Sequence, residues 1–387
     1  MSCAELGFGH IFRVISLGKS LEERGDELFF FCGGAAYQVL KREFQNVIPC
    51  TPVGWYENAR GIATSASLLN ILIPLPYLHT ETHRVEIKSP SAVETVRRYY
   101  DLRRKIRQIK PDAVIADGDM HALRLAQRWK LPSVYVTNLI RPSYGFSPFL
   151  VPGERFTERY VKACSKIVVP DNPSPYTICG LNIGNLSDMG IEDRVEFVGS
   201  FQDMTPLEGP RQHIFAPISG PLGTRAKLTK LVISTLKKLD VKCVISLGLM
   251  GKKAVTKVKN CEIHTWLSRE ERGEYMKNAS LVIFSGGHGT CFETIKYLKP
   301  SVCVPTQPEQ RGNAKQMQDL GCSVIAKNDE QLKRAIREIE AKEELFTRNV
   351  EQVNRFSNKF KGVENAITVI EGLANAQEMA ATESIQD

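Results

Sequence analysis

The stretch that most constrains the fold is residues 281–293, in which an apolar strand runs into glycines and then into a helix. Residues 281–284 form an apolar run of strand length with a β-rich composition. The triplet 285–287 (Ser-Gly-Gly) ends that strand, and helical spacing of apolar residues begins at Thr290. Such a turn brings several backbone N–H groups and a helix N-terminus to one point, which attracts anions and above all phosphate. The sequence therefore predicts a phosphate-binding turn at the carboxyl end of a strand.

Polar side chains follow this turn and the next predicted strand. Glu293 lies about one turn into the helix, where its carboxylate can accept hydroxyl donors beside the same pocket. Residues 302–305 form a second short strand, and Gln307, Glu309, Gln310 and Asn313 follow it as hydrogen-bonding groups suited to sugar hydroxyls. A phosphate cradle beside a hydroxyl-binding carboxylate describes a nucleotide-sugar site. The glycines alone fit an ordinary strand-to-helix turn equally well.

Residues 285–293 and 305–314 together resemble the donor-binding half of GT-B nucleotide-sugar glycosyltransferases. They are most similar to the family 28 type, which includes the bacterial enzyme that adds N-acetylglucosamine to a lipid-linked peptidoglycan precursor. A looser similarity extends to UDP-glucuronosyl and plant UDP-glycosyltransferases, and an archaeal branch of family 28 looks nearest overall. The resemblance implies an α/β, GT-B fold in which two doubly wound, Rossmann-like domains face a central cleft.

The same resemblance implies a donor site. In these families the glycine turn and its helix hold the diphosphate, a glutamate matching Glu293 binds the ribose, and an acidic-Gln pair matching Glu309-Gln310 binds the sugar. A glycine-rich loop at residues 219–225 matches the first loop of the family's donor domain. The residues expected to bind the nucleotide sugar are Ser219, Gly220, Gly223, Thr224, Arg225, Ser285, Gly286, Gly287, His288, Gly289, Thr290, Glu293, Glu309, Gln310 and Asn313.

A second glycine turn lies near the start of the chain. Gly7 and Gly9 precede a helix predicted over residues 11–24, and a strand follows at 27–32, as in the opening of a doubly wound domain. The strand before the turn is short, so either it is abbreviated or the chain begins upstream of residue 1. The turn resembles the acceptor-side loop of family 28, with His10 and Arg13 at matching positions. In related glycosyltransferases a histidine here takes the acceptor proton, whereas a lone histidine at a helix start is more often structural.

The strand predicted at residues 111–117 ends in Asp117 and Asp119, at the sheet edge where open α/β domains bind ligands. In plant-type GT-B enzymes an aspartate from this region steadies the catalytic histidine, so either aspartate could do so for His10. The pair also spells a D-x-D motif, but it lies on the predicted acceptor side. We therefore expect no metal and no cofactor besides the UDP-sugar donor, with loop N–H groups and Arg225 stabilising the leaving diphosphate.

A chain of 387 residues is long for one core and comfortable for two domains. Residues 200–211 are polar with two prolines, which favours a boundary there. We predict an acceptor-binding domain over residues 1–199, a linker over 200–211 and a nucleotide-sugar-binding domain over 212–345. By the resemblance, helices over 346–373 cross back to the first domain, and 374–387 form a tail.

The net charge of +8 suggests an anionic partner. No nucleic-acid recognition motif is present, so we expect no nucleic acid, and an anionic membrane surface suits a lipid-linked acceptor better. A basic helix predicted over residues 92–109 is either a solvated face or a lipid-docking surface. Its arginines are Arg97, Arg98, Arg103, Arg104 and Arg107.

The ten cysteines are scattered without metal-binding or redox spacing, which points to the reducing cytosol. No apolar run approaches the roughly 20 residues that span a bilayer, and no signal peptide is expected. We therefore expect a cytoplasmic protein, peripheral on the inner membrane face.

These observations predict a hexosyltransferase that moves a hexose or N-acetylhexosamine from a UDP-sugar to a hydroxyl or phosphate acceptor, lipid-linked, with His10 as base. By the resemblance, a histidine base implies inversion through a single displacement. Two alternatives remain open. One is a UDP-sugar 2-epimerase, which shares the fold and can share a glycine loop with a glutamate. The other is a non-catalytic GT-B accessory subunit that docks on membranes or recruits a partner.

Overall fold

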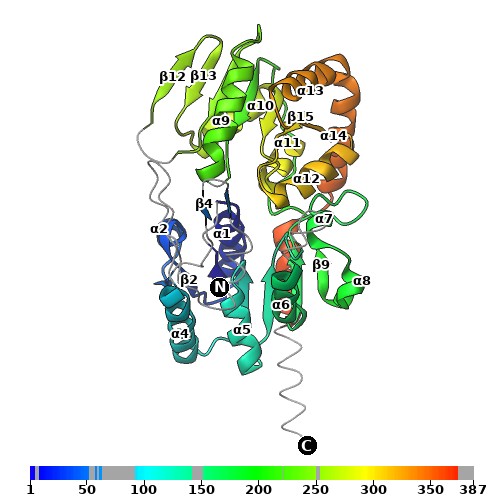
Figure 1. Ribbon diagram of the computed structural model, residues 1–387. Helices are drawn as coiled ribbons and strands as arrows, with labels where there is room; N and C mark the ends of the chain where they lie inside the picture. Colours follow the sequence, from blue (N-terminus) through cyan, green and yellow to red (C-terminus); the bar gives the residue numbers. More distant parts are fainter. Residues whose placement is uncertain are drawn as a thin grey trace, which may run out of the picture.

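Two α/β domains, each built on its own seven-stranded sheet, are stacked with the first below the second in Figure 1. The computed structural model describes residues 1–4, 8–51, 57–58, 61–62, 92–141, 151–220, 222–249 and 253–373. Helices pack on both faces of each sheet, as in doubly wound domains. The predicted fold class is confirmed.

The sheet of the first domain is parallel throughout, with the strand order β3-β2-β1-β6-β7-β8-β9. Its strands are β1 (Ser2–Cys3), β2 (Phe30–Cys32), β3 (Val47–Pro49), β6 (Val114–Asp117), β7 (Ser133–Val136), β8 (Lys166–Val169) and β9 (Val195–Phe197). The chain runs outward from β1 to β3 and then crosses to β6 on the other side of β1. The short strand β1 is therefore central. All strands stay parallel, but the order in which the chain adds them changes direction between β1 and β6, which is the reversal point of the sheet.

The helices of the first domain are α1 (Phe8–Glu23), α2 (Gly34–Glu43), α4 (Ala92–Ile109), α5 (Met120–Trp129), α6 (Val151–Lys162), α7 (Gly180–Ile183), α8 (Leu186–Met189) and the 3-10 helix η2 (Glu192–Arg194). Strands β4 (Glu57–Asn58) and β5 (Gly61–Ile62) form a small hairpin. The apolar stripe of α1 is buried at Ile11, Val14, Leu17 and Leu21. The predicted basic helix over 92–109 is confirmed as α4.

The second domain repeats the plan with the strand order β12-β13-β11-β10-β14-β15-β16, in which only β12 is antiparallel to its neighbour. Its strands are β10 (His213–Pro217), β11 (Cys243–Ser246), β12 (Val255–Val258), β13 (Cys261–His264), β14 (Ala279–Phe284), β15 (Ser301–Cys303) and β16 (Ser323–Ile325). Its helices are α9 (Leu222–Leu236), α10 (Arg269–Lys277), α11 (His288–Lys296), α12 (Pro308–Asp319), α13 (Asp329–Ala341) and α14 (Glu343–Ser357). The strand order of this sheet changes direction between β10 and β14, which is its reversal point.

The C-terminal helices divide between the two domains. Val350 and Val353 of α14 pack in the core of the second domain. Residues 362–373 are helical and lie in the lower domain, where Ile367 shares a core with Leu17 and Leu21 of α1. The chain passes between the domains close to residue 200, and a side chain at Gly362 would collide with the backbone there. The predicted tail over 374–387 lies outside the described residues.

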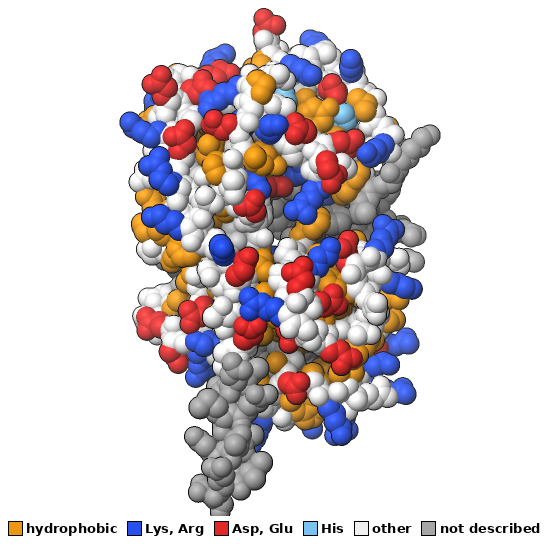
Figure 2. Space-filling model, turned by 180° about the vertical axis from the view of Figure 1, so that it is seen from behind, with side chains coloured by type: hydrophobic (Ala, Val, Ile, Leu, Met, Phe, Trp, Pro, Cys, Tyr) orange, Lys and Arg blue, Asp and Glu red, His pale blue; other side chains and the backbone are white. Residues whose placement is uncertain are grey.

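Basic and acidic side chains are interspersed over the face shown in Figure 2, so no field of one sign covers it. All ten cysteines are free and buried. Among the described helices, none combines the length and the apolar character that crossing a bilayer requires.

Candidate active site

The two glycine-rich loops of the second domain meet at the reversal point of its strand order, between β10 and β14. One loop joins β10 to α9 and the other joins β14 to α11, and β10 and β14 are neighbours. Gly220 and Gly286 have φ angles of +101° and +84°, which side-chain-bearing residues rarely adopt. The Ser285 side chain is fully buried, and its hydroxyl has no hydrogen-bond partner among the described residues. Because a fully buried hydroxyl normally finds a partner, this group is suited to a ligand oxygen.

Helix α12 braces these loops. Asn313 donates through Nδ2 to the carbonyl of Gly286 at 3.0 Å and lies 3.4 Å from Glu309 Oε1. The side-chain oxygen of Gln310 accepts from the backbone N–H of Thr306 at 2.9 Å, which caps the start of α12. The side-chain oxygen of Gln310 therefore already has a partner in the cap of α12. The structure brings the predicted sugar-binding residues together with the predicted phosphate turn.

Arg225 braces the first loop through its carbonyls. Its Nη2 and Nε donate to the Gly220 oxygen at 2.6 and 3.1 Å, and its Nη1 donates to the Gly248 oxygen at 2.7 Å. These donors hold the shape of the loop, and the contact of this guanidinium with the diphosphate stays a prediction. Gly223 and Thr224 lie in the first turn of α9, and Ser219 precedes it.

Glu293 is paired with an arginine that the sequence did not reveal. Arg272 Nε lies 3.1 Å from Glu293 Oε1, Nη2 contacts the other carboxylate oxygen, and Nη2 also lies 3.3 Å from Thr290 Oγ1. Arg272 is on α10, which follows the loop after β13, and no motif marks it. The guanidinium fixes the direction of the carboxylate, and each carboxylate oxygen keeps a lone pair for another donor.

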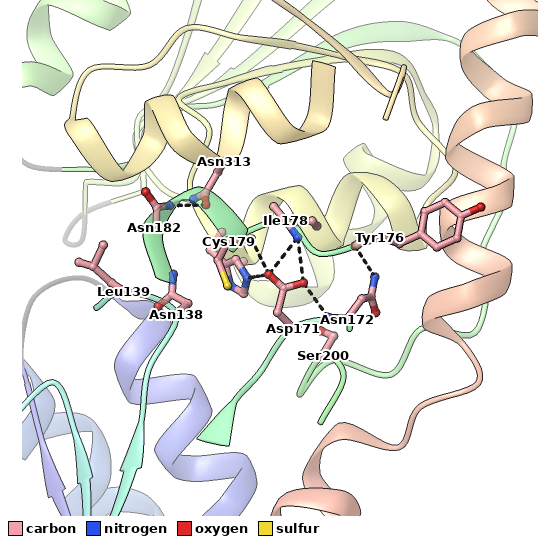
Figure 3. Close-up of polar contacts among 12 residues, drawn as sticks. Asn138, Leu139, Asp171, Asn172, Tyr176, Ile178, Cys179, Asn182, Ser200 and Asn313 are labelled. Carbon is pink, nitrogen blue, oxygen red and sulfur yellow. Dashed lines mark hydrogen bonds and ion pairs between the residues drawn. The ribbon is translucent and has the colours of Figure 1, made fainter. Parts of the chain in front are cut away.

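His288 turns away from the predicted donor site. Its Nε2 lies 2.9 Å from Asp171 Oδ2 in the segment after β8 of the first domain. Asp171 also accepts N–H bonds from Asn172, Ile178 and Cys179, and Figure 3 shows these bonds converging on one carboxylate. The side chain therefore has a partner in the first domain, and binding of the nucleotide sugar by residue 288 stays a prediction. The contact between His288 and Asp171 holds the phosphate turn against the first domain.

Asp171, Cys179 and His288 bring possible metal ligands within 4.8 Å of one another. Both oxygens of Asp171 already accept N–H bonds. Burial, followed by the charge of Asp171, raises the pKa of the Cys179 thiol well above its ordinary value. Metal binding requires a thiolate and free carboxylate lone pairs. The chemistry of this cluster therefore fits an interdomain clamp rather than a metal centre.

His10 and Asp117 meet at the reversal point of the strand order in the first domain, between β1 and β6. His10 lies in the first turn of α1, and Asp117 ends β6, the strand beside β1. His10 Nδ1 lies 2.6 Å from Asp117 Oδ1. The carboxylate is 2% exposed and the imidazole 26%. Gly118, with a φ of +72°, leaves room for the ring, since a Cβ there would lie 3.2 Å from its Cε1.

Arg13 completes this arrangement on the buried side. Its Nε and Nη2 lie 2.9 and 2.7 Å from the two oxygens of Asp117. Burial alone would raise the pKa of Asp117, but Arg13 and His10 lower it to about 2. Nδ1 lies 2.6 Å from this ionised carboxylate and 2.9 Å from Arg13 Nη2. In the tautomer that donates from Nδ1 to the carboxylate, the lone pair is on Nε2. This is the arrangement of a general base.

Asp119 is placed differently from Asp117, which resolves the alternative that the sequence left open. Its side chain is fully buried, lies 2.7 Å from Arg98 Nη2 and caps α5 by accepting from the His121 N–H. Asp119 is thus a structural residue, and its catalytic assignment is corrected. Arg98 is likewise buried, so it does not belong to the exposed basic face that was predicted for α4.

Of the two glycines expected in the acceptor loop, Gly7 lies outside the described residues. A side chain at Gly9 would meet no atom of the described residues within 4 Å. Sequence reasoning missed Asn138, which lies just after β7 and contacts both Arg13 and Glu309.

The comparisons with known proteins agree with this geometry. Residues 224–367 match the model of the glycosyltransferase family 28 C-terminal domain. The chain is 25% identical over 384 residues to an uncharacterized glycosyltransferase of Methanosarcina acetivorans, covering 93% of this chain and 94% of that protein.

Solved glycosyltransferases share the whole architecture. The MurG structure of Acinetobacter baumannii superposes with a TM-score of 0.58 at 15% identity, over 96% of this chain and 98% of that one. The spinosyn rhamnosyltransferase SpnG, complexed with thymidine diphosphate, superposes with a TM-score of 0.64 at 14% identity, over 94% and 96%. The fold is that of the GT-B glycosyltransferases. The chain is similar to glycosyltransferases of the family 28 type, and residues 224–367 match that family's C-terminal domain, as residues 285–314 predicted.

Proposed function

We propose that the chain transfers a hexose or N-acetylhexosamine from a UDP-sugar to a hydroxyl or phosphate group of a lipid-linked acceptor, with inversion through a single displacement. The observation that carries this proposal is the His10–Asp117 pair at the reversal point of the first sheet. It is joined through Arg13, Asn138 and Glu309 to the glycine loops at the reversal point of the second. A nucleoside diphosphate bound to the solved rhamnosyltransferase supports a donor of the same chemical class.

The chemistry follows from these positions. His10 Nε2 takes the proton of the acceptor hydroxyl, and Asp117 stabilises the imidazolium that forms. The acceptor oxygen attacks the anomeric carbon on the side opposite to the diphosphate, so one displacement inverts that centre. The N–H groups of residues 219–220 and 285–287 and the Ser285 hydroxyl stabilise the charge on the departing diphosphate.

The direct test is incubation of the protein with a panel of UDP-sugars and lipid extracts, followed by mass spectrometry. We expect one lipid species to gain the mass of the donor sugar, together with released UDP. Free epimerised sugar or UDP formed without an acceptor would favour the 2-epimerase. Neither turnover nor nucleotide binding would favour an accessory subunit.

Replacing Glu293 by alanine should weaken UDP binding by about 10- to 100-fold, as measured by calorimetry. A charged hydrogen bond of this kind contributes roughly 1.5–3 kcal/mol, and the variant also leaves Arg272 without its carboxylate partner. The matched control is Glu274→Ala on the exposed side of α10, which should bind UDP normally. Unchanged affinity in a folded Glu293 variant would remove this residue from the site.

We further propose that transfer needs neither a metal nor another cofactor. Asp117, Asp119 and Asp171 are engaged by arginines or N–H groups, which supports leaving-group stabilisation by the loops instead. Activity should therefore persist in EDTA at a rate within about twofold of the untreated protein. Loss of activity that manganese or magnesium restores would contradict this proposal.

The lipid-linked acceptor would be met on the cytoplasmic face of an anionic membrane. Helix α4 supports this, because Val96 and Tyr100 are 41% and 56% exposed beside the exposed arginines Arg97, Arg104 and Arg107. Apolar and basic side chains on one helix face suit the interface of anionic lipid.

Reversing Arg97 and Arg104 to glutamate should weaken sedimentation with phosphatidylglycerol vesicles by about 10-fold or more, since each basic residue near such a surface contributes roughly 1 kcal/mol. The control double variant, Arg348→Glu/Arg355→Glu on α14, carries the same change in net charge on the other domain. Equal losses in the two double variants would indicate a general charge effect and refute a docking role for α4.

A further inference from the structure

A series of hydrogen bonds runs from the histidine of the first domain to helix α12 of the second. Arg13, which binds both oxygens of Asp117, also donates through Nη1 to Asn138 Oδ1 at 3.3 Å. Asn138 donates through Nδ2 to Glu309 Oε1 at 3.2 Å. One buried amide therefore lies between the carboxylate that orients His10 and the carboxylate proposed to bind the sugar.

The chemistry of its neighbours permits Asn138 only one orientation. Its oxygen faces a guanidinium, which only donates, and its nitrogen faces a carboxylate, which only accepts. Rotating the amide by 180° would oppose N–H to N–H and oxygen to oxygen. The residue is 6% exposed, and the turn around it is fixed because Thr137 Oγ1 accepts from the Leu139 N–H at 3.0 Å.

The other end of the series is held equally firmly. Asn313 binds both Glu309 Oε1 and the carbonyl of Gly286 in the phosphate turn. Asn182 of the first domain donates to Asn313 Oδ1 at 2.8 Å, a bond drawn in Figure 3, and to the backbone oxygen of Glu309 at 3.0 Å. The Glu309 carboxylate is therefore fixed relative to the turn that is proposed to hold the diphosphate.

Arg13 carries the only positive charge in this series and serves two carboxylates. Burial alone would lower its pKa, but Asp117 and, more weakly, Glu309 raise it. If the second domain moved away, Glu309 would leave, and Asn138 would lose the acceptor that aligns its oxygen with Arg13. The hydrogen bonds from Arg13 to Asp117 would then be less well aligned.

We propose that Asn138 is a positioning residue that couples the orientation of His10 and Asp117 to contact between the two domains at Glu309. The inference rests on the proposed function, because it concerns the same site. It implies that the acceptor is activated only when the sugar-binding carboxylate is in place, which limits proton abstraction to the assembled site.

The test compares Asn138→Asp in two backgrounds. With Glu309 present, the new carboxylate opposes Glu309, and we expect the turnover of donor hydrolysis to fall by about 10- to 100-fold, the range for losing a charged hydrogen bond. With Glu309→Gln, the amide of residue 309 can donate to the new aspartate, which still accepts from Arg13, and only the longer 3.4 Å contact from Asn313 is given up. In that background the same substitution should cost less than about threefold. Comparing each variant with its own background removes the direct effect of Glu309 on the sugar.

The probes are UDP-glucose and UDP-N-acetylglucosamine with water as acceptor, and UDP alone for calorimetry. Affinity for UDP should stay unchanged in Asn138→Asp, because the nucleotide loops lie on the second domain. A fall in turnover without loss of UDP affinity separates positioning from a general structural defect. Asn138→Leu removes both bonds, and Glu309→Gln should not rescue it.

A second readout does not need turnover. In protein labelled with ¹⁵N-histidine, the His10 resonances, assigned by their absence in His10→Gln, should report the proton on Nδ1 in the parent. We expect that signature to weaken in Asn138→Asp and to return in Asn138→Asp/Glu309→Gln.

Equal losses in both backgrounds, with an unchanged His10 signature, would overturn the inference while leaving the proposed transfer intact. A parent protein that neither hydrolyses the donors nor binds UDP would refute the proposed function, and the histidine signature would still decide whether Asn138 positions His10.

Discussion

Replacing His10 by alanine should lower turnover by about 10²–10⁴-fold, the usual contribution of a positioned general base. Affinity for UDP should hardly change, because His10 lies on the first domain and the predicted nucleotide loops lie on the second. Initial rates of sugar transfer or donor hydrolysis give the first quantity, and calorimetry with UDP gives the second. Because the pKa of Asp117 is about 2, that carboxylate stays ionised in any assay at neutral pH.

Two further variants sharpen this test. His10→Gln keeps a polar side chain but accepts a proton poorly, so it should be almost as slow as the alanine variant. Asp117→Asn keeps the shape of the buried group but removes the charge that holds the proton on Nδ1, so it should also lower turnover. An alanine variant that retains most of its turnover would make His10 a structural residue at the start of α1, and the base would lie elsewhere.

Replacing Asp119 by alanine should lower the free energy of unfolding by about 3–5 kcal/mol, because it leaves the Arg98 guanidinium buried without its partner. This loss is large against the roughly 5–15 kcal/mol of a whole domain. Both side chains are fully buried, and Ser2 Oγ also contacts the Asp119 carboxylate. Urea and thermal unfolding measure the loss, and the folded fraction should still bind UDP.

The pair offers its own control. Arg98→Met/Asp119→Asn removes both charges and keeps a side chain that can cap α5, so it should be more stable than Arg98→Met alone. Burial alone would raise the pKa of Asp119, but Arg98 lowers it to about 2. The stabilisation is therefore complete above about pH 4 and is lost as the pH falls towards 2. A folded, normally stable Asp119→Ala variant with reduced turnover would restore Asp119 to the catalytic group.

Local patterns predicted the elements of this protein well. The apolar run at 281–284 lies in β14, the basic segment at 92–109 is α4, and the glycine turn at 285–287 joins β14 to α11. The start of the first helix was less accurate, since α1 begins at Phe8 and not at residue 11, before the apolar spacing is visible. Periodicity reports which face of a segment is buried, and it carries no information about which distant segment covers that face.

Partners between distant segments could not be predicted in this way. The sequence could not choose between Asp117 and Asp119, because both follow the same strand and only the pairing of β1 with β6 directs one of them towards His10. It gave no sign of Arg272 or Asn138, which carry no motif. It also gave no sign that the His288 side chain contacts the carboxylate of Asp171 in the first domain.

The sequence by itself determined the two strand-glycine-helix turns of the second domain, the α/β class and the similarity to family 28, because each is encoded within a few dozen consecutive residues. The tertiary structure decided which charges meet. His10 and Asp117 are 107 positions apart, and Asn138 and Glu309 are 171 apart. Such pairs form only at the reversal points of the two sheets and where the two domains touch. Electrostatic partners are selected by distance in space and by exclusion of water, and local composition specifies neither.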